Sequence, residues 1–194
     1  MIVAFLTPLT YMSIHDGIND RIGDQRICRL VPHNKKDPRQ RTVLMSQEIT
    51  EMVDGPWQDG LMGDRCARLR ADLENFVTGA RMTVCWEPFE AKKEAQIGRL
   101  DPIGDEVWDF RCQEPSPGLR VFCRFADKDI VVALTCYPRS ISVPWLDRLP
   151  LLDSKRRWRR AIIDCRSEWK KLFPAHEPIS RDHIDEYLSN AILQ

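Results

Sequence analysis

The fold is decided by three stretches of sequence, Glu106-Val-Trp-Asp-Phe-Arg-Cys112, Leu119-Arg-Val-Phe-Cys-Arg-Phe125 and Ile130-Val-Val-Ala-Leu-Thr-Cys136. The first stretch alternates in the manner of a strand, and the third is almost continuously apolar, as a central strand buried on both faces is. The linking segments Pro115-Ser-Pro-Gly118 and Ala126-Asp-Lys-Asp129 have the composition of turns. The sequence therefore predicts an antiparallel β-meander.

Helices are predicted before and after this meander. Apolar residues at helical spacing predict one helix over residues 64–77 and a second that Asp153 or Ser154 caps. A third helix is predicted after Ser180, where apolar residues again form one stripe. The predicted fold class is α+β, with an antiparallel β-meander sheet packed against helices.

The first part of the chain has weaker patterns. Residues 13–42 are rich in Asp, Asn, Gly and Pro, which predicts loops with one short strand near residues 27–31. We therefore expect a loop-rich arm over residues 1–60 and an α+β domain over residues 61–194. That domain should begin with a helix and a strand over residues 82–89 and end with two helices.

The composition is that of an ordinary globular chain of 194 residues, 43% hydrophobic and 30% charged. Basic and acidic residues number 29 each, so any binding of nucleic acid must come from a local concentration of charge. No apolar run reaches the roughly 20 residues that span a bilayer. The apolar N-terminus also lacks the basic residues that begin a signal peptide. We expect a cytoplasmic protein with no membrane partner.

Familiar catalytic motifs, such as a P-loop, GxSxG or HExxH, do not occur in the sequence. The seven cysteines form no CxxC pair, and four of them lie in strand-like runs, as small buried side chains in a reducing compartment do. The four histidines lack the spacing of metal ligands. We expect no metal and no cofactor, which disfavours a hydrolase that depends on a metal or on a histidine triad.

Arginines are the residues that could carry chemistry. Arg111, Arg120, Arg124 and Arg139 lie on the predicted meander or at its ends. Guanidinium groups on a rigid sheet can hold a phosphodiester through paired hydrogen bonds and stabilise developing negative charge. The structural alternative is a set of arginines that pair with neighbouring aspartates such as Asp109.

A second basic feature is the predicted helix over residues 153–171. It carries eight Lys or Arg and three Asp or Glu, a local net charge of +5. Its outward side is either a solvated helix face or a contact for RNA, DNA or the ribosome. The candidate RNA-binding residues are Arg124, Arg156, Arg157, Arg159 and Arg160.

The predicted sheet resembles that of the RelE/ParE toxin superfamily, including its HigB and phage-derived members. The resemblance covers residues 98–145 and rests on Glu106-Val-Trp-Asp-Phe-Arg111, Gly118-Leu-Arg-Val-Phe122, Asp129-Ile-Val-Val-Ala-Leu134 and Tyr137-Pro-Arg139. It implies a RelE/ParE-like core with N-terminal and C-terminal helical extensions. This chain is longer than such toxins and is neutral where they are basic.

The resemblance implies a toxin of the type II toxin–antitoxin kind that cleaves mRNA on the ribosome without a metal. Arg111, Arg120 and Arg139 would hold and stabilise the phosphate while its own 2′-hydroxyl attacks, and Trp145 would stack on a base. The implied partners are an antitoxin protein, the ribosome and mRNA. Asp109 stands where such toxins often have a lysine.

Three functions remain open from the sequence. If the protein is a toxin-like ribonuclease, we expect a concave sheet lined by the arginines. The second possibility is a non-catalytic binding protein on the same scaffold, such as a gyrase-directed toxin or a phage or mobile-element protein. In that case we expect salt-bridged arginines and an interface on the basic helix or the terminal helices. The third possibility is an unrelated α+β enzyme or structural protein. In that case we expect residues 1–90 to form part of the central sheet. The acidic segments 16–24 and 48–59 could cover a basic site within the chain.

Overall fold

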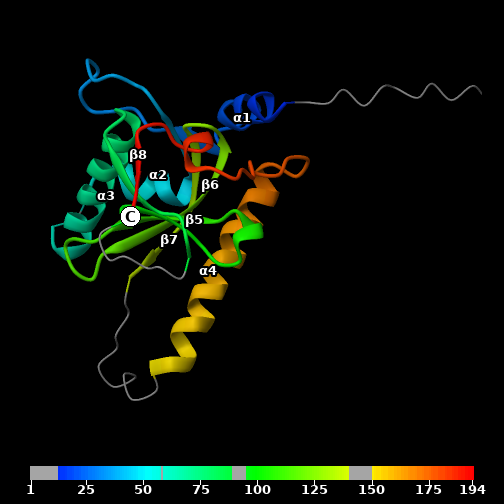
Figure 1. Ribbon diagram of the computed structural model, residues 1–194. Coiled ribbons are helices and arrows are strands. Elements are labelled where there is room, and N and C mark those ends of the chain that lie inside the picture. Colours follow the sequence, from blue (N-terminus) through cyan, green and yellow to red (C-terminus); the bar gives the residue numbers. More distant parts are fainter. Residues whose placement is uncertain (1–12, 58, 89–94, 140–149) are drawn as a thin grey trace, which may run out of the picture.

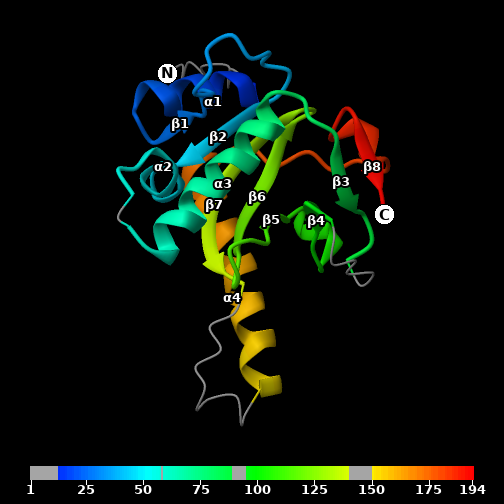
Figure 2. The same ribbon diagram turned by 90° about the vertical axis from the view of Figure 1, so that its left-hand side faces the viewer.

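The computed structural model describes residues 13–57, 59–88, 95–139 and 150–194. Within these residues, eight strands form one mixed sheet, and helices cover both of its faces (Figures 1 and 2). The strand order is β1-β2-β7-β6-β5-β4-β3-β8. The strands are β1 (Ile27–Arg29), β2 (Thr42–Ser46), β3 (Met82–Cys85), β4 (Ile97–Arg99), β5 (Trp108–Cys112), β6 (Leu119–Asp127), β7 (Ile130–Pro138) and β8 (Ala191–Leu193).

The α+β class is confirmed, but the sheet is mixed where an antiparallel sheet was expected. β5, β6 and β7 pair in antiparallel fashion, whereas β2 runs parallel to β7, and β3 runs parallel to both β4 and β8. Short hairpins impose antiparallel pairing on the strands that they join. β2, β3 and β8 reach their neighbours through long connections, which allow a parallel approach. The sequence of the meander alone does not predict how β2, β3 and β8 pair.

Two helical layers enclose the sheet. α2 and α3 pack on one face, and α1 and α4 pack on the other, so the core is divided into two apolar clusters. Figure 2 shows α3 in front of the strands and α4 behind them, with one end of α4 extending past the sheet. The helices are α1 (Ile14–Gly23), α2 (Gln47–Asp54), α3 (Leu61–Val77) and α4 (Pro150–Leu172), with short 3-10 turns η1 (Ile103–Asp105) and η2 (Ile184–Glu186).

β7 is buried on both faces, as its continuous apolar sequence predicts. Val131 and Ala133 belong to the cluster under α2 and α3, while Val132 and Leu134 belong to the cluster under α4. Successive side chains of a strand point to opposite faces, so only an apolar run satisfies both layers. The predicted helices over residues 64–77 and from about residue 153 are also confirmed, as α3 and α4.

The expectation of a loop-rich arm over residues 1–60 is wrong for the described part of that segment. Ser13 and Asp16 form a reciprocal capping box that starts α1, and Ser46 caps α2. β2 lies between β1 and β7, and four of its five residues are buried. Local caps and a short buried strand therefore produce regular structure where the composition suggested loops.

The helix expected after Ser180 is also wrong, because the end of the chain is drawn onto the sheet instead. The hydroxyl groups of Ser180 and Tyr187 both donate to the Glu106 carboxylate, at 2.7 and 2.8 Å. Beyond the single turn of η2, residues 191–193 pair with β3 as strand β8. The predicted apolar stripe thus packs against strands rather than along a helix.

The anchor of this C-terminal segment is a buried ion pair. Arg99 Nη2 lies 2.5 Å from Glu106 Oε1, and both side chains are less than one-tenth exposed. The guanidinium stands over the ring of Trp86, 4.6 Å from its centroid, with Trp108 and Tyr187 completing an aromatic surround. The ion pair, the hydroxyl donors and the aromatic rings hold residues 180–187 against β4 and the start of β5.

We predict that Glu106→Gln lowers the free energy of unfolding by about 3–5 kcal/mol, because it leaves the buried charge of Arg99 without a counter-charge. Urea denaturation followed by circular dichroism measures the change. Glu87→Gln, at an exposed glutamate, serves as the matched control and should change stability by less than about 0.5 kcal/mol. Equal small effects of the two substitutions would contradict this account of the anchor.

Candidate functional site

Two of the four predicted catalytic residues lie side by side. Arg111 on β5 stands opposite Arg120 on β6, and both side chains bind the carboxylate of Asp109. Arg111 Nε lies 3.0 Å from Asp109 Oδ1. Asp109 is fully buried, and the Arg111 side chain is only 8% exposed, so this cluster belongs to the interior of the α4 side of the sheet.

Gly98 makes room for the first of these ion pairs. It lies on β4 directly opposite Asp109, and a Cβ atom there would stand 2.0 Å from Arg111 Nη2. A larger residue would displace the guanidinium from Asp109. The close approach of backbone and side chain explains why glycine occupies this position.

Helix α4 closes over the second arginine. The Arg120 guanidinium lies over the ring of Trp158, 4.9 Å from its centroid, and Phe122 packs against the same ring. Burial lowers the pKa of Arg120, although the neighbouring Asp109 carboxylate opposes that shift. The side chain is 20% exposed. Arg120 therefore joins α4 to the sheet and is not presented in an open concavity.

The remaining sheet candidates are placed elsewhere. Arg139 is an exposed residue just after β7, where its backbone N–H donates to the Gly118 carbonyl at 2.7 Å. Arg124 is 4% exposed, donates to the Asp105 carbonyl and lies over the Trp169 ring. Arg124, predicted to contact RNA, is thus an interior residue. Trp145 lies outside the described residues.

A hydrogen bond from Tyr137 also joins α4 to the sheet. Its hydroxyl donates to Asp164 Oδ2 at 2.6 Å, and Asp164 also pairs with Arg160. Burial, followed by the hydrogen bond to Asp164, raises the pKa of Tyr137 to about 12. Tyr137 therefore stays protonated and acts as a donor that fixes α4 to the end of β7.

The opposite side of α4 is a strongly basic surface. The inward positions, among them Ile162, Cys165 and Trp169, are buried against the sheet. Residues three and four positions apart share one side of a helix, so the remaining side chains collect on the outer side. We call this surface the basic face of α4. It consists of Arg156, Arg159, Arg160, Ile163, Arg166, Ser167, Lys170 and Lys171.

The cations of the basic face fall into two groups. One group has acidic partners, in the ion pairs Arg160–Asp164, Arg166–Asp105 and Lys171–Glu168. Within the described part of the chain, the structure gives no ion pair or hydrogen bond to the side chains of Arg156, Arg159 and Lys170. These three cations are exposed and available to an external anion. Arg157, the last of the predicted helix arginines, is exposed on the flank of the same helix.

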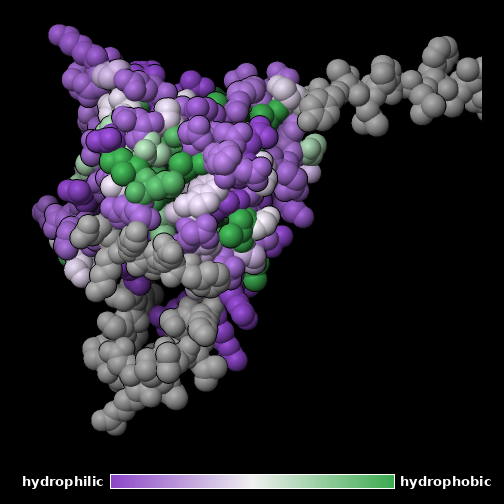
Figure 3. All heavy atoms as spheres, viewed as in Figure 1, coloured by the Kyte–Doolittle hydropathy of each residue, from purple (hydrophilic) through white to green (hydrophobic). Residues whose placement is uncertain are grey.

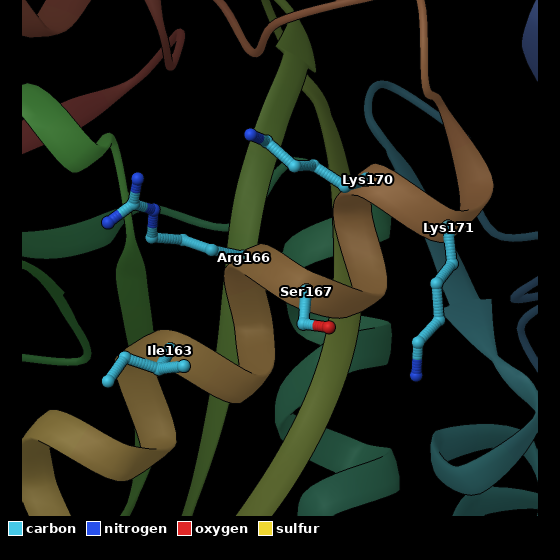
Figure 4. A pocket seen from close by; sticks show the side chains of 5 residues that line it. All are labelled: Ile163, Arg166, Ser167, Lys170 and Lys171. Carbon is cyan, nitrogen blue, oxygen red and sulfur yellow. The ribbon is translucent and has the colours of Figure 1, made fainter.

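The middle of the basic face begins with Arg156 and continues with two uncharged residues, Ile163 and Ser167. Ile163, 54% exposed, and Ser167 line a shallow hollow together with Arg166, Lys170 and Lys171. Figure 4 shows Arg166 and Lys170 pointing to one side of Ser167 and Lys171 pointing to the other. In Figure 3, the atoms of the lower part of α4 that are visible beside the grey atoms are hydrophilic. Ile163 was missed by the sequence reasoning, although an apolar residue outside the buried stripe is a signal that could have found it.

Comparison with protein-family models, with curated proteins and with solved structures gives no match. Among the described residues, no helix has both the length and the apolar character to cross a bilayer. The same residues contain no group of three or more histidine, cysteine or carboxylate side chains arranged to hold a metal ion. Any function must therefore be argued from the arginine cluster and the basic face themselves.

We predict that the cluster around Asp109 stabilises the fold. Asp109→Asn should lower the free energy of unfolding by about 3–5 kcal/mol, because two buried cations lose their counter-charge. The loss should be smaller by at least ~1 kcal/mol in an Arg120→Gln background, since that variant has already lost one of the cations. Urea denaturation of both single variants and the double variant gives this coupling.

The matched control is the same cycle on the partly exposed pair of Arg21 and Asp24, whose side chains are 25% and 60% exposed, where coupling should stay below about 0.5 kcal/mol. If Asp109→Asn leaves the stability unchanged, the cluster is not a structural element. In that case Arg111 and Arg120 have to be reconsidered as residues held ready for a ligand.

Proposed function

We propose that this protein binds nucleic acid through the basic face of α4, and that it acts by binding rather than by cleaving. The observation that carries the proposal is a set of three exposed cations on one side of a helix, Arg156, Arg159 and Lys170, which have no partner among the residues that the structure describes. The whole chain has no net charge, so this surface is a local excess and not part of a general positive charge.

Electrostatics favours a polyanion as the partner. Each lysine or arginine that neutralises a phosphate releases a condensed counterion, which gives binding energy that falls steeply with salt. Exposed like charges on one helix face repel one another, and a nucleic-acid backbone relieves that repulsion. An isolated acidic side chain of another protein would neutralise only one of these cations.

The arrangement of the sheet arginines argues against the ribonuclease implied by the RelE/ParE resemblance. Metal-free cleavage of RNA needs guanidinium groups directed at the scissile phosphate. Arg111 and Arg120 instead direct donors at the buried Asp109, and Arg120 lies beneath Trp158. Salt-bridged sheet arginines are the arrangement expected for a binding protein.

The relationship to RelE/ParE toxins, with its antitoxin, ribosome and gyrase partners, stays a hypothesis. The central sheet includes β2 and β3 from the first 90 residues, as expected for an unrelated α+β protein. The binding proposal does not depend on that relationship, because it rests on the charges and geometry of α4 alone.

We predict that Arg156→Ala combined with Arg159→Ala weakens binding to labelled nucleic-acid duplexes in fluorescence anisotropy. The slope of log Kd against log salt should become shallower by about 2, one unit for each lost phosphate contact. The control removes two exposed lysines, Lys35 and Lys36, from the loop between β1 and β2. Its slope should equal that of the unaltered protein.

The same samples test whether the protein acts without cleavage. The labelled RNA should stay intact, and so should mRNA in a bacterial cell-free translation reaction mapped by primer extension. Ribosome-dependent cuts that disappear in Arg120→Ala and Arg139→Ala would overturn the proposal and establish the ribonuclease. Equal salt slopes for the α4 variant and its control would remove α4 as the binding surface.

A further inference from the structure

We propose that the nucleic acid is double-stranded DNA and that the basic face of α4 enters its major groove. This inference rests on the proposed function, since it specifies the form of nucleic acid that the same surface binds. Arg159 and Lys170 contact the phosphates of one groove wall. Arg160 and Lys171, which also pair with Asp164 and Glu168, lie towards the other wall, and Ile163 and Ser167 face the edges of the bases.

The dimensions of α4 suit this groove. A helix with its side chains measures about 10–12 Å across, and the major groove of B-DNA is about 12 Å wide and 8.5 Å deep. The 23 residues of α4 extend for about 34 Å. Figures 1 and 2 show that the N-terminal part of the helix leaves the body of the molecule, away from the other labelled elements. The N-terminal part of α4 therefore stands clear of the sheet, and the basic face points away from the side that packs on the strands.

The distribution of charge around the helix fits a groove with two phosphate walls. At 100° per residue, Arg159, Arg166 and Lys170 form one row, and Arg160 and Lys171 form another. Arg156, Ile163 and Ser167 lie between the rows, and Figure 4 shows Ser167 between Lys170 and Lys171. From Arg156 to Lys171 the face extends for about 22 Å, long enough for each row to reach more than one phosphate.

The uncharged part of the face, at Ile163 and Ser167, has a specific counterpart in DNA. The C5-methyl group of thymine projects into the major groove, where apolar side chains contact it. Ile163 is the exposed apolar residue in the middle of this face, and its 54% exposure leaves its methyl groups accessible. RNA lacks that methyl group because it carries uracil.

Other anionic partners fit the same surface less well. The major groove of A-form RNA is deep and too narrow for side chains to read. Single strands are held by exposed aromatic platforms, whereas the Trp158 ring packs on Phe122 and Arg120. Helices that lie on membranes bury an apolar face in the lipid, but the apolar face of α4 is already buried against the sheet.

The test compares labelled probes of one sequence by fluorescence anisotropy at one salt concentration: a DNA duplex, an RNA duplex and a single DNA strand. The DNA duplex should bind at least ten-fold more tightly than either alternative. Vesicles of phosphatidylserine and phosphatidylcholine should not compete. A DNA duplex with deoxyuridine in place of thymidine should bind about threefold more weakly, and Ile163→Ala should bind both DNA duplexes equally.

The other outcomes of this test overturn either the major-groove inference alone or the proposed function together with it. If the RNA duplex or the single strand binds as tightly as the DNA duplex, the major-groove inference is overturned while nucleic-acid binding stands. Equal binding of the thymidine and deoxyuridine duplexes by the unaltered protein would also overturn it, because Ile163 then contacts no base. If no nucleic acid binds, or if vesicles alone bind, the proposed function fails together with the inference.

Discussion

The Asp109 carboxylate determines how charge is divided between the interior and the surface of this protein. It is fully buried in the face of the sheet that α4 covers, and it holds the guanidinium groups of Arg111 and Arg120. Without it, two cations would face an apolar layer at a cost of several kcal/mol each. With it, Trp158 stacks on Arg120 and α4 packs on the strands. The helix is thereby fixed with its own cations on the outside.

Burial and counter-charge separate the structural arginines from those open to a ligand. Arg41 is buried and donates to backbone carbonyls of Phe76 and Ala80, and Arg99 is buried against Glu106. Burial lowers the pKa of Arg41, which reflects the cost of placing a cation there. Guanidinium groups thus join distant segments of this chain in several places. Arg156, Arg159 and Lys170 on α4 have no such partner within the described part of the chain, and this contrast is why their surface is the candidate binding surface.

The sequence predicted the parts of the fold that have strong local periodicity. α3, the central strands and the buried stripe of α4 follow from apolar spacing alone. β2 was missed because Thr42–Ser46 is short and gains its burial from strands far along the chain. The C-terminal segment was misassigned because Ser180 and Tyr187 bond to Glu106, a contact that no local pattern reveals.

The candidate site, like the fold, could be predicted from the sequence only where a local pattern reveals it. The basic helix was visible as a run of arginines, and pairing of the sheet arginines with Asp109 was one of the two interpretations of the sequence. The sequence could not show that the pairing of Asp109 with Arg111 and Arg120 is buried. That burial depends on α4, which covers Arg120, and on the close approach of Gly98. It also could not show that Arg124 is interior, because Trp169 and Asp105 come from separate elements. Exposure, rather than residue type, decides which arginines can meet a phosphate.

The most direct measurement is a titration of the ¹⁵N-labelled protein with a DNA duplex, followed by amide NMR. If the outer side of α4 is the functional surface and the sheet arginines are structural, chemical-shift changes should concentrate in residues 156–171. The amides of β5 and β6 should change little. The largest changes at Arg111 and Arg120, with α4 unaffected, would contradict the account and return the site to the sheet.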